Sequence, residues 1–410
     1  MASPLSKYFT GVGIKRLSQV EISPDLSNQH EFNGINEFRN IFGPEKKKFT
    51  AKFIYLSDDE DKLIESDGFV TWYDARENHP SRTEYRLYYS TNEVLTEAKA
   101  NDLIVVGQTG EAKLAVIVAP QNSTAEKQLL WLFGVEEAAN KFLIKDLTGD
   151  KKDIGFAGRY ILSSLGMEPD EIAPDFLEEL LKRYGNNFPT TKEFSSFARS
   201  TVKEVFPIEA PDETLIAWLE REELLFKTLE RVIVKEQLKK GFGKDGTDVD
   251  EFIKLSLSIQ NRRKSRAGFS FENNLAILFS LNKIHYSHGA VTERNNKPDF
   301  IFPEIKYYHD NGFDANLLVM LGVKTTAKDR WRQILSEAAK IPDKHMVTLE
   351  PAISRNQTEE MVANNLQLVI PRPLFSTYSL NQQKQLLTLK DFICLVETKQ
   401  NKYGASPLLF

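Results

Sequence analysis

The stretch GVKTTAKDRWRQILSEAAKI (322–341) decides the fold of the larger part of this chain. Together with the apolar run NLLVML (316–321) before it, it predicts a buried strand that ends at the polar Lys324. A helix is then expected over 331–341, because apolar residues recur there at helical spacing and should pack on the sheet: Trp331, Ile334, Leu335, Ala338 and Ile341. Upstream, KPDFIFP (297–303) predicts a second strand that begins at Asp299.

An acid on one strand and a lysine on the next are typical of metal-dependent nuclease cores. Such cores commonly carry a second acid two residues before the lysine, but here that residue is Gly322. Glu337 lies 13 residues after Lys324, at the border of the packed face of the expected helix. Because Mg²⁺ chemistry requires carboxylates at the right place in space, an acid from a neighbouring helix can serve as the second one.

Composition is that of an ordinary soluble protein of two or three domains: 410 residues, 41% hydrophobic and 27% charged. No run of about 18 apolar residues predicts a membrane span, and the first residues lack the apolar region of a signal peptide. The single cysteine, Cys394, excludes an intrachain disulfide and a cysteine-rich zinc site. The expected location is the cytosol. The net charge of −5 hides local basic runs such as NRRKSR (261–266).

Three regions are predicted along the chain. Residues 1–160 show short β-prone runs between polar turns, which favour an all-β barrel or sandwich; the runs are 49–56, 68–74, 84–90, 102–108 and 112–120. Residues 161–186 read as a partly helical linker. Residues 187–410 alternate strands with helices and predict an α/β domain with a central sheet. Its expected helices include 210–243, 249–263 and 269–284.

A histidine pair and a glycine-rich turn predict no metal site and no phosphate site, respectively. His285 and His288 suggest a metal pair, but no further ligand nearby completes a zinc set, so they are interpreted as ordinary residues. GFGKDG (241–246) lacks the spacing of a phosphate-binding loop and is interpreted as a helix stop followed by a turn.

Three segments in the same order resemble the EcoRII-type family of type II restriction endonucleases, a migrated-acid branch of the PD-(D/E)xK superfamily. They are NRRKSRAG (261–268), KPDFIFP (297–303) and VKTTAKDRWRQIL (323–335). The similarity is densest between residues 239 and 341 and extends weakly to both ends of the chain. It implies a restriction-endonuclease-like α/β domain with a central mixed sheet flanked by helices, and Mg²⁺ as cofactor.

The resemblance also implies roles for particular residues. Asp299 and Glu337 match the metal-binding acids, Lys324 the catalytic lysine, and Glu272 an acid that assists at the metal site.

The triplet Lys328, Asp329 and Arg330 matches residues that read CC and GG in the major groove. That role suits their chemistry, because Arg or Lys can bond guanine and a carboxylate can accept from cytosine N4. The basic run would contact the DNA backbone through Arg262, Arg263, Lys264 and Arg266. Family members flip out the central nucleotides with an arginine and an aromatic residue; the candidates here are Trp218, Arg221 and Phe226.

The first 160 residues resemble, more loosely, the family's effector-binding domain, a DNA-binding pseudobarrel. Two arms, 15–29 and 72–86, would then enter the major groove of an effector DNA. The candidate contacts are Lys15, Arg16, Arg76, Arg82 and Arg86.

The expected function is thus that of a Mg²⁺-dependent type II, and more narrowly type IIE, restriction endonuclease. It would act on double-stranded DNA as a homodimer at a palindromic site such as CCWGG or CCNGG, with a second DNA copy as activator. A cognate methyltransferase would belong to the same prokaryotic system without forming a stable complex. The alternatives are a non-enzymatic DNA-binding regulator on a decayed nuclease fold and a methylation-dependent nuclease.

Overall fold

The structure is a computed structural model that describes residues 4–22, 30–33, 36–59, 63–167 and 172–405. Its contacts divide the chain into two compact units. Unit 1 comprises residues 1–169 together with 351–357, and unit 2 comprises residues 170–350 and 358–410. Within the described ranges, no helix is both long enough and apolar enough to cross a membrane.

Unit 1 is built on one sheet, whose eight strands in the described residues lie in the order β2-β5-β4-β3-β7-β6-β1-β8. Neighbouring strands are antiparallel except β3 and β7, which are parallel. The strands are β1 (Gly11–Arg16), β2 (Glu31–Asn33), β3 (Lys47–Tyr55), β4 (Ile64–Asp74), β5 (Tyr85–Tyr89), β6 (Leu103–Gly110), β7 (Lys113–Ala119) and β8 (Leu143–Asp146).

Both faces of this sheet are buried along its central strands. In β6, Leu103 and Val105 belong to one apolar cluster, whereas Ile104 and Val106 belong to another. Such alternation in a run without polar residues is expected of a strand covered on both sides. The short helices of unit 1 are η1 (Leu5–Lys7), α1 (Gln19–Ile22), η2 (Asn36–Phe38), α2 (Arg39–Phe42), α3 (Glu93–Glu97), α4 (Thr124–Leu132) and α5 (Gly155–Ser164).

The five strands predicted for this region are confirmed as β3 to β7, with ends that differ by a few residues. The prediction missed β1, β2 and β8, and α4 and α5 show that the unit is not purely β. Among the described residues, the edge strands β2 and β8 do not pair with each other. A DNA-binding pseudobarrel therefore stays a prediction.

Residues 351–357 belong to unit 1 although the rest of the late chain belongs to unit 2. Hydrogen bonds to α4 hold them. Thr124 Oγ1 donates to Gln357 Oε1 over 2.8 Å and accepts from the Ser354 amide over 3.0 Å, and Gln128 Nε2 donates to the Pro351 carbonyl over 3.1 Å.

Unit 2 contains a mixed five-stranded sheet in the order β13-β12-β11-β10-β9. Strands β11, β12 and β13 are parallel, and β9 and β10 are antiparallel to their neighbours. The strands are β9 (Ser287–His288), β10 (Phe300–Phe302), β11 (Val319–Lys324), β12 (Lys344–Thr348) and β13 (Leu366–Val369). This confirms the predicted α/β domain with a central mixed sheet.

Helices flank this sheet and also form a separate layer. Phe279 of α9 and Phe392 of α14 contact Phe302 of β10 on the sheet. The helices of unit 2 are α6 (Pro174–Tyr184), α7 (Thr191–Ser200), α8 (Pro211–Lys239), α9 (Val249–Leu281), η3 (Glu293–Asn295), α10 (Ile305–His309), η4 (Ala315–Leu317), η5 (Lys328–Arg330), α11 (Trp331–Leu335), α12 (Arg355–Ala363), η6 (Arg372–Thr377), α13 (Leu380–Gln383) and α14 (Leu389–Ala405).

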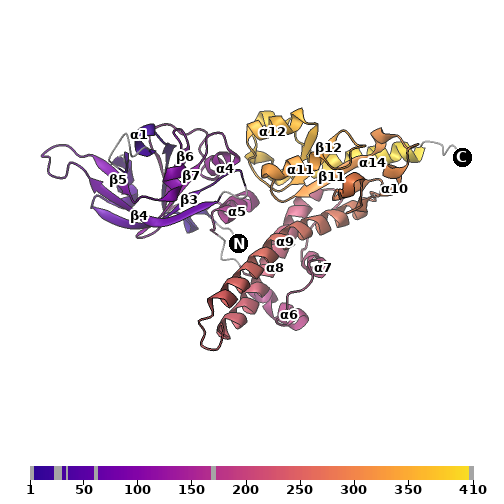
Figure 1. The fold of residues 1–410 in the computed structure, drawn as a ribbon, viewed down its shortest axis with the longest axis horizontal. Coiled ribbons are helices and arrows are strands. Elements are labelled where there is room, and N and C mark those ends of the chain that lie inside the picture. The colour runs from indigo at the N-terminus through magenta and orange to yellow at the C-terminus, as the bar shows by residue number, and fades with distance from the viewer. Residues whose placement is uncertain (1–3, 23–29, 34–35, 60–62, 168–171, 406–410) are drawn as a thin grey trace. The chain divides into compact units, whose positions relative to one another are not determined.

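The two helices expected at 249–263 and 269–284 are one continuous helix, α9, which runs through Gly268. Figure 1 shows α8 and α9 side by side as a long hairpin, with α6 and α7 next to them. The region predicted as a linker is also helical. Residues 161–164 of this region are the last residues of α5, and Ile161 and Leu162 belong to the core of unit 1. The later helix α6 packs on α8 in unit 2.

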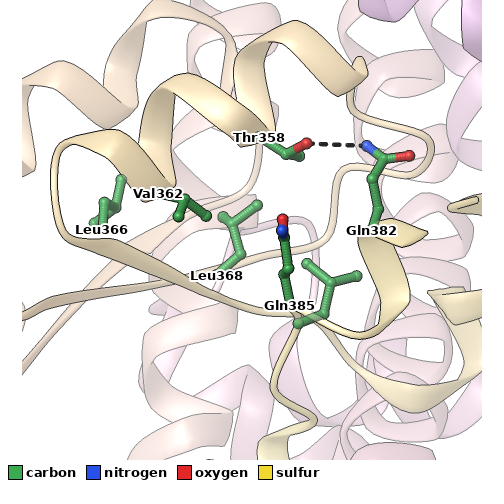
Figure 2. Close-up of a pocket in the computed structure, with 7 residues that line it drawn as sticks. Thr358, Val362, Leu366, Leu368, Gln382 and Gln385 are labelled. Atoms are coloured by element: carbon green, nitrogen blue, oxygen red, sulfur yellow. Dashed lines mark hydrogen bonds between the residues drawn. The ribbon is translucent and has the colours of Figure 1, made fainter. Parts of the chain in front are cut away.

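Unit 2 is closely packed around the end of its parallel strands. A cavity of about 10 Å³ lies between α12, β13 and α13. Figure 2 shows residues that line it, among which Gln382 Nε2 donates to Thr358 Oγ1 over 3.1 Å. Since a cavity of this volume holds about one water molecule, it is a packing gap and not a ligand site.

Gly322 explains how α11 packs against the sheet. A Cβ atom at position 322 would lie 2.6 Å from Ile334 Cδ1 and 2.9 Å from Ile334 Cγ1. Ile334 is fully buried, so it cannot move aside without disturbing the core. The side chain of Ile334 thus occupies the space in which an acid at position 322 would lie.

We predict that Gly322→Ala lowers the free energy of unfolding by about 1–3 kcal/mol, the usual cost of overpacking a core. Urea unfolding of the full chain measures this. In the Ile334→Ala background, the same change should cost much less, because the colliding atoms are gone. Gly268→Ala is the control: its Cβ would meet nothing within 4 Å in α9, so it should stabilise the chain slightly. Equal costs in both backgrounds would contradict the contact.

Candidate active site at the strand ends of unit 2

Asp299 and Lys324 are brought together by the antiparallel pairing of β10 and β11. Asp299 comes directly before β10, and Lys324 is the last residue of β11. Asp299 Oδ2 accepts from the Val323 amide over 2.6 Å and lies 3.3 Å from Lys324 Nζ. Both side chains are largely shielded, with exposed fractions of 19% and 12%. The carboxylate and the cation are therefore held as a pair.

Glu337 lies in the turn after α11, because this helix ends at Leu335 and does not reach residue 341 as predicted. Burial raises the pKa of Glu337 to about 7; the charge of Asp299 also raises it, and the cation of Lys324 opposes both. The charges of Asp299 and Lys324 therefore both act on the Glu337 carboxyl group. Its Oε2 is buried and has no hydrogen-bond partner in the described structure.

Lys344 fixes the turn that carries Glu337. Its ammonium donates to the carbonyl oxygens of Glu337 and Ala338 over 2.5 and 2.6 Å. Ala338 adopts a positive φ of 48°, which is unfavourable for a residue with a Cβ atom. Because Lys344 is buried in β12, it ties the strained turn to the sheet.

Glu272 joins the same neighbourhood from α9. Its Oε2 lies 2.8 Å from His288 Nε2, on the edge strand β9. This hydrogen bond raises the pKa of His288, and the negative charges of Glu272 and Asp299 add to the effect against the opposing influence of burial. The sequence reading treated His288 as an ordinary residue. Strand pairing could have indicated a role at the site, because His288 on β9 lies opposite Phe300, the residue that follows Asp299.

The donor set fits a hard divalent cation. Asp299 and Glu337 offer carboxylate oxygens, and the Glu337 oxygen that lacks a partner is buried, which is costly unless a ligand satisfies it. Among the described residues, no group of three histidine, cysteine or acidic side chains is gathered as a complete cage. Mg²⁺ does not require one, because it is usually bound by one or two carboxylates together with substrate phosphate and water.

The predicted reading triplet Lys328, Asp329 and Arg330 forms the short helix η5, between β11 and α11. Glu350, a buried residue, holds the backbone before it: Glu350 Oε2 accepts from the amides of Ala327 and Lys328 over 2.5 and 3.3 Å. These bonds offset the cost of the positive φ of Lys328. The sequence analysis missed Glu350, although it is a lone acid within the apolar run MVTLEPAI (346–353).

The basic run 262–266 does not form one solvent-facing set. The burial of Arg266 counts against a DNA-backbone contact from that residue, and the contacts expected from the other three stay predictions. Arg266 is buried, forms an ion pair with Glu222 over 3.1 Å and stacks on Phe226. Arg263 pairs with Glu230 over 2.6 Å, and Arg262 lies over the ring of Phe188. Lys264 is exposed. The cause is the position of the run in the middle of α9, where one side faces α8.

Several effector candidates of unit 1 are also engaged within the protein. Lys15 is buried and ion-paired with Glu21, because its segment is the paired strand β1 and not an arm. Arg16 pairs with Glu126 over 2.8 Å. Arg86 pairs with Glu31 and Glu84, and Arg76 pairs with Glu84, whereas Arg82 is exposed. The segment 23–29 of the first predicted arm lies outside the described residues.

The base-flipping candidates lie in the helical layer. Trp218 and Phe226 are buried at 4% and 5% exposure. Arg221 donates from Nε to Thr201 Oγ1 over 2.8 Å and lies over the Phe176 ring. In this structure these three residues belong to the packing of the helical layer, and their base-flipping role stays a prediction.

Comparison with known proteins identifies the part of the chain that contains this site. Residues 226–393 match the family model described as EcoRII C terminal. The chain is 43% identical over 208 residues to the type II restriction enzyme EcoRII of Escherichia coli, and this covers 50% of each chain. The chain thus matches about half the length of that curated relative. The predicted resemblance to EcoRII-type restriction endonucleases is confirmed, and the matched region contains Asp299, Lys324 and Glu337.

Solved structures of restriction endonucleases are also similar to the chain. Metal-depleted Ecl18kI in complex with uncleaved, modified DNA gives a TM-score of 0.46 at 19% identity, covering 57% of this chain and 87% of that one. The PspGI–substrate DNA complex gives 0.43 at 18% identity, covering 52% and 94%.

The raised pKa of Glu337 predicts a pH-dependent stability for the metal-free protein. Between pH 5 and 7.5 the folded chain keeps a proton that an unfolded glutamate has released, so raising the pH favours unfolding. We expect the free energy of unfolding to fall by about 2 kcal/mol over this range, after discounting for partial exposure. In the Glu337→Gln variant, the free energy of unfolding should fall by about 2 kcal/mol less over the same pH range, because residue 337 no longer titrates.

Urea unfolding in a chelator at several pH values measures the difference between the two proteins. Glu397→Gln, which changes an exposed acid on α14, is the control and should behave as the wild type. Parallel pH profiles for the wild type and Glu337→Gln would show that the Glu337 carboxyl group is not buried as described.

Proposed function

We propose that this chain is a Mg²⁺-dependent type II restriction endonuclease. The observation that carries the proposal is the Asp299–Lys324 pair at one strand end, whose charges act on the partly buried Glu337 carboxyl group. The family match over residues 226–393 supports the same function. Hydrolysis by such a site adds water to the phosphorus of a DNA phosphodiester and releases the sugar oxygen.

Asp299 and Glu337 would hold the metal, with Glu272 in support. When bound, Mg²⁺ neutralises charge on the phosphate and lowers the pKa of the attacking water. The Val323 amide and Lys324 fix the orientation of the Asp299 carboxylate before substrate arrives. Lys324 then presents a cation that can stabilise negative charge on the phosphate oxygens as it develops. Glu337 must give up its proton, which its pKa near neutrality permits.

Sequence recognition would come from Lys328, Asp329 and Arg330, four to six residues after the catalytic lysine. Their backbone is anchored through Glu350, so the reading side chains and the metal-binding acids share one rigid frame. The resemblance of this triplet to the residues that read CC and GG in the family supports a site such as CCWGG or CCNGG. Since such sites are palindromic, we propose that two copies of the chain act together on double-stranded DNA. The proposed location is the cytoplasm of a prokaryote, beside a cognate methyltransferase.

Cleavage of genomic DNA in Mg²⁺ tests the nuclease function. We expect wild-type protein to cut, whereas Asp299→Asn, Lys324→Ala and Glu337→Gln should each lose about 10²–10³-fold in rate, as for other charge-stabilising groups. Glu397→Gln, which removes a carboxylate far from the site in sequence and exposed on α14, should retain activity. Sequencing the new ends gives the site and the stagger.

Other outcomes distinguish the alternatives. No cleavage by the wild type with retained site-specific DNA binding would point to a regulator on a decayed nuclease fold. Cleavage confined to methylated DNA would point to a methylation-dependent nuclease. Undiminished cleavage by Glu337→Gln would overturn the placement of the second metal-binding acid.

Activation by a second DNA copy, as in a type IIE enzyme, is proposed for unit 1. With Lys15, Arg16, Arg76 and Arg86 engaged internally, the loop between β4 and β5 is the remaining candidate arm, because it carries the exposed Arg82. A cognate oligonucleotide should then accelerate cleavage of a plasmid with one site. Arg82→Ala should reduce this acceleration and leave the basal rate unchanged. A basal rate that does not respond to the oligonucleotide would contradict the activation.

A further inference from the structure

The first half of α9 presents an apolar surface to solvent. Its apolar side chains Val249, Phe252, Ile253 and Leu257 are 65%, 50%, 47% and 53% exposed. Arg266 is the first buried residue of the helix, so the seventeen residues before it, 249–265, lie outside the core. In Figure 1 this half of α9 and the end of α8 form the projecting part of the helical hairpin. Clustered exposed apolar residues mark contact surfaces more often than scattered ones do.

Leu257 is the centre of this face. On an ideal helix, residues seven apart are about two turns apart and drift by only about 20°. Asp250 and Lys264 each lie seven residues from Leu257, one before it and one after it, and therefore flank it on the same face. Both side chains are exposed, and in the described structure neither forms an ion pair within the chain. Ile253 fills the space between Asp250 and Leu257.

A second copy of α9 is complementary to this arrangement when it runs antiparallel. In a two-fold contact of this kind, a residue that lies a given number of positions before the axis on one copy faces the residue that lies the same number of positions after the axis on the other copy. With the axis at Leu257, Asp250 of each copy faces Lys264 of the other, about 10 Å along the helix from the axis. Two oppositely charged pairs then close the ends of an apolar contact made by Leu257 and Ile253.

We propose that α9 pairs antiparallel with α9 of a second copy of this chain, with Leu257 on the two-fold axis. This inference rests on the proposed function, which requires two copies of the chain. It adds which surface the two copies share and which residues face each other across it. DNA would find cations in Lys254 and Lys264, but its phosphates would be repelled by Asp250 and Glu251 and would leave the exposed Ile253 and Leu257 uncovered, so it is a poorer occupant of this face. The apolar stripe is small beside the roughly 800 Å² per partner of a standard interface, so the association should weaken with added salt.

Disulfide trapping tests the register. The exposed Cys394 is first replaced by serine, and Leu257→Cys is then introduced. A cysteine on the two-fold axis faces its own copy within disulfide distance, so mild oxidation should give a covalent dimer. Ser258→Cys is the matched control: it is exposed and adjacent in sequence, but points about 100° away around the helix. We expect it to cross-link at least about tenfold more slowly than Leu257→Cys. Equal rates would overturn the proposal.

Charge exchange tests the complementarity. Asp250→Lys or Lys264→Asp alone places like charges opposite each other twice in the dimer. Each should weaken self-association about tenfold or more in sedimentation experiments at low salt. The double variant restores opposite charges and should recover the wild-type association. Weakening by both single changes without recovery in the double variant would overturn the pairing. So would unchanged association combined with tighter DNA binding by Asp250→Lys, which would identify DNA as the occupant.

Both experiments are done without Mg²⁺ and without cleavage as readout. A protein that does not cut DNA can still give the predicted cross-link, and an active nuclease can fail to give it. Failure of the pairing and failure of the proposed function are therefore distinguishable. Circular dichroism of each variant shows whether the exposed substitutions leave the fold intact.

Discussion

The hydrogen bond from the Val323 amide to Asp299 Oδ2 is the constraint on which the site of unit 2 depends. The donor is a backbone amide near the end of β11, and the acceptor is a carboxylate that precedes β10. The antiparallel register of the two strands therefore determines the orientation of Asp299. The same register brings Lys324 beside that acid. Loss of this register would separate the charges without changing any residue of the site.

The remaining acid follows from how α11 packs. Ile334 lies against Gly322, where no Cβ atom fits, and this close approach lets the turn after α11 return toward the strand ends. Glu337 is carried by that turn, and Lys344 fixes it from β12. Gly322 in the strand and Glu337 after the helix thus belong to one arrangement. The close packing of Ile334 leaves no space for an acid at position 322, and the turn after α11 carries Glu337 instead.

The short strand β9 was not predicted, and the role of Glu337 as the second acid stays a prediction. The sequence was sufficient to predict β10 to β13 and the position of Asp299 and Lys324 at strand ends. These features depend on local apolar runs and on residues that end them. It was insufficient where an outcome depends on contacts far along the chain. Arg266 and Lys15 were expected to contact DNA because the segments that contain them resemble the family, but Glu222 and Glu21 pair with them in the folded chain. Likewise, the apolar spacing after Trp331 continues to Ile341, yet the helix ends at Leu335, where the strained turn at Ala338 is held by Lys344.

The partly protonated state of Glu337 has a consequence for the charge that an approaching DNA strand meets. Near neutral pH about half of the molecules carry this acid in its uncharged form. In those molecules the charges of Asp299 and Lys324 offset each other, and Glu337 adds no negative charge to the pair. The second negative charge becomes fully available only when a cation replaces the proton. For the proposed DNA substrate, this protonation would lower the repulsion between a phosphate and the metal-free site.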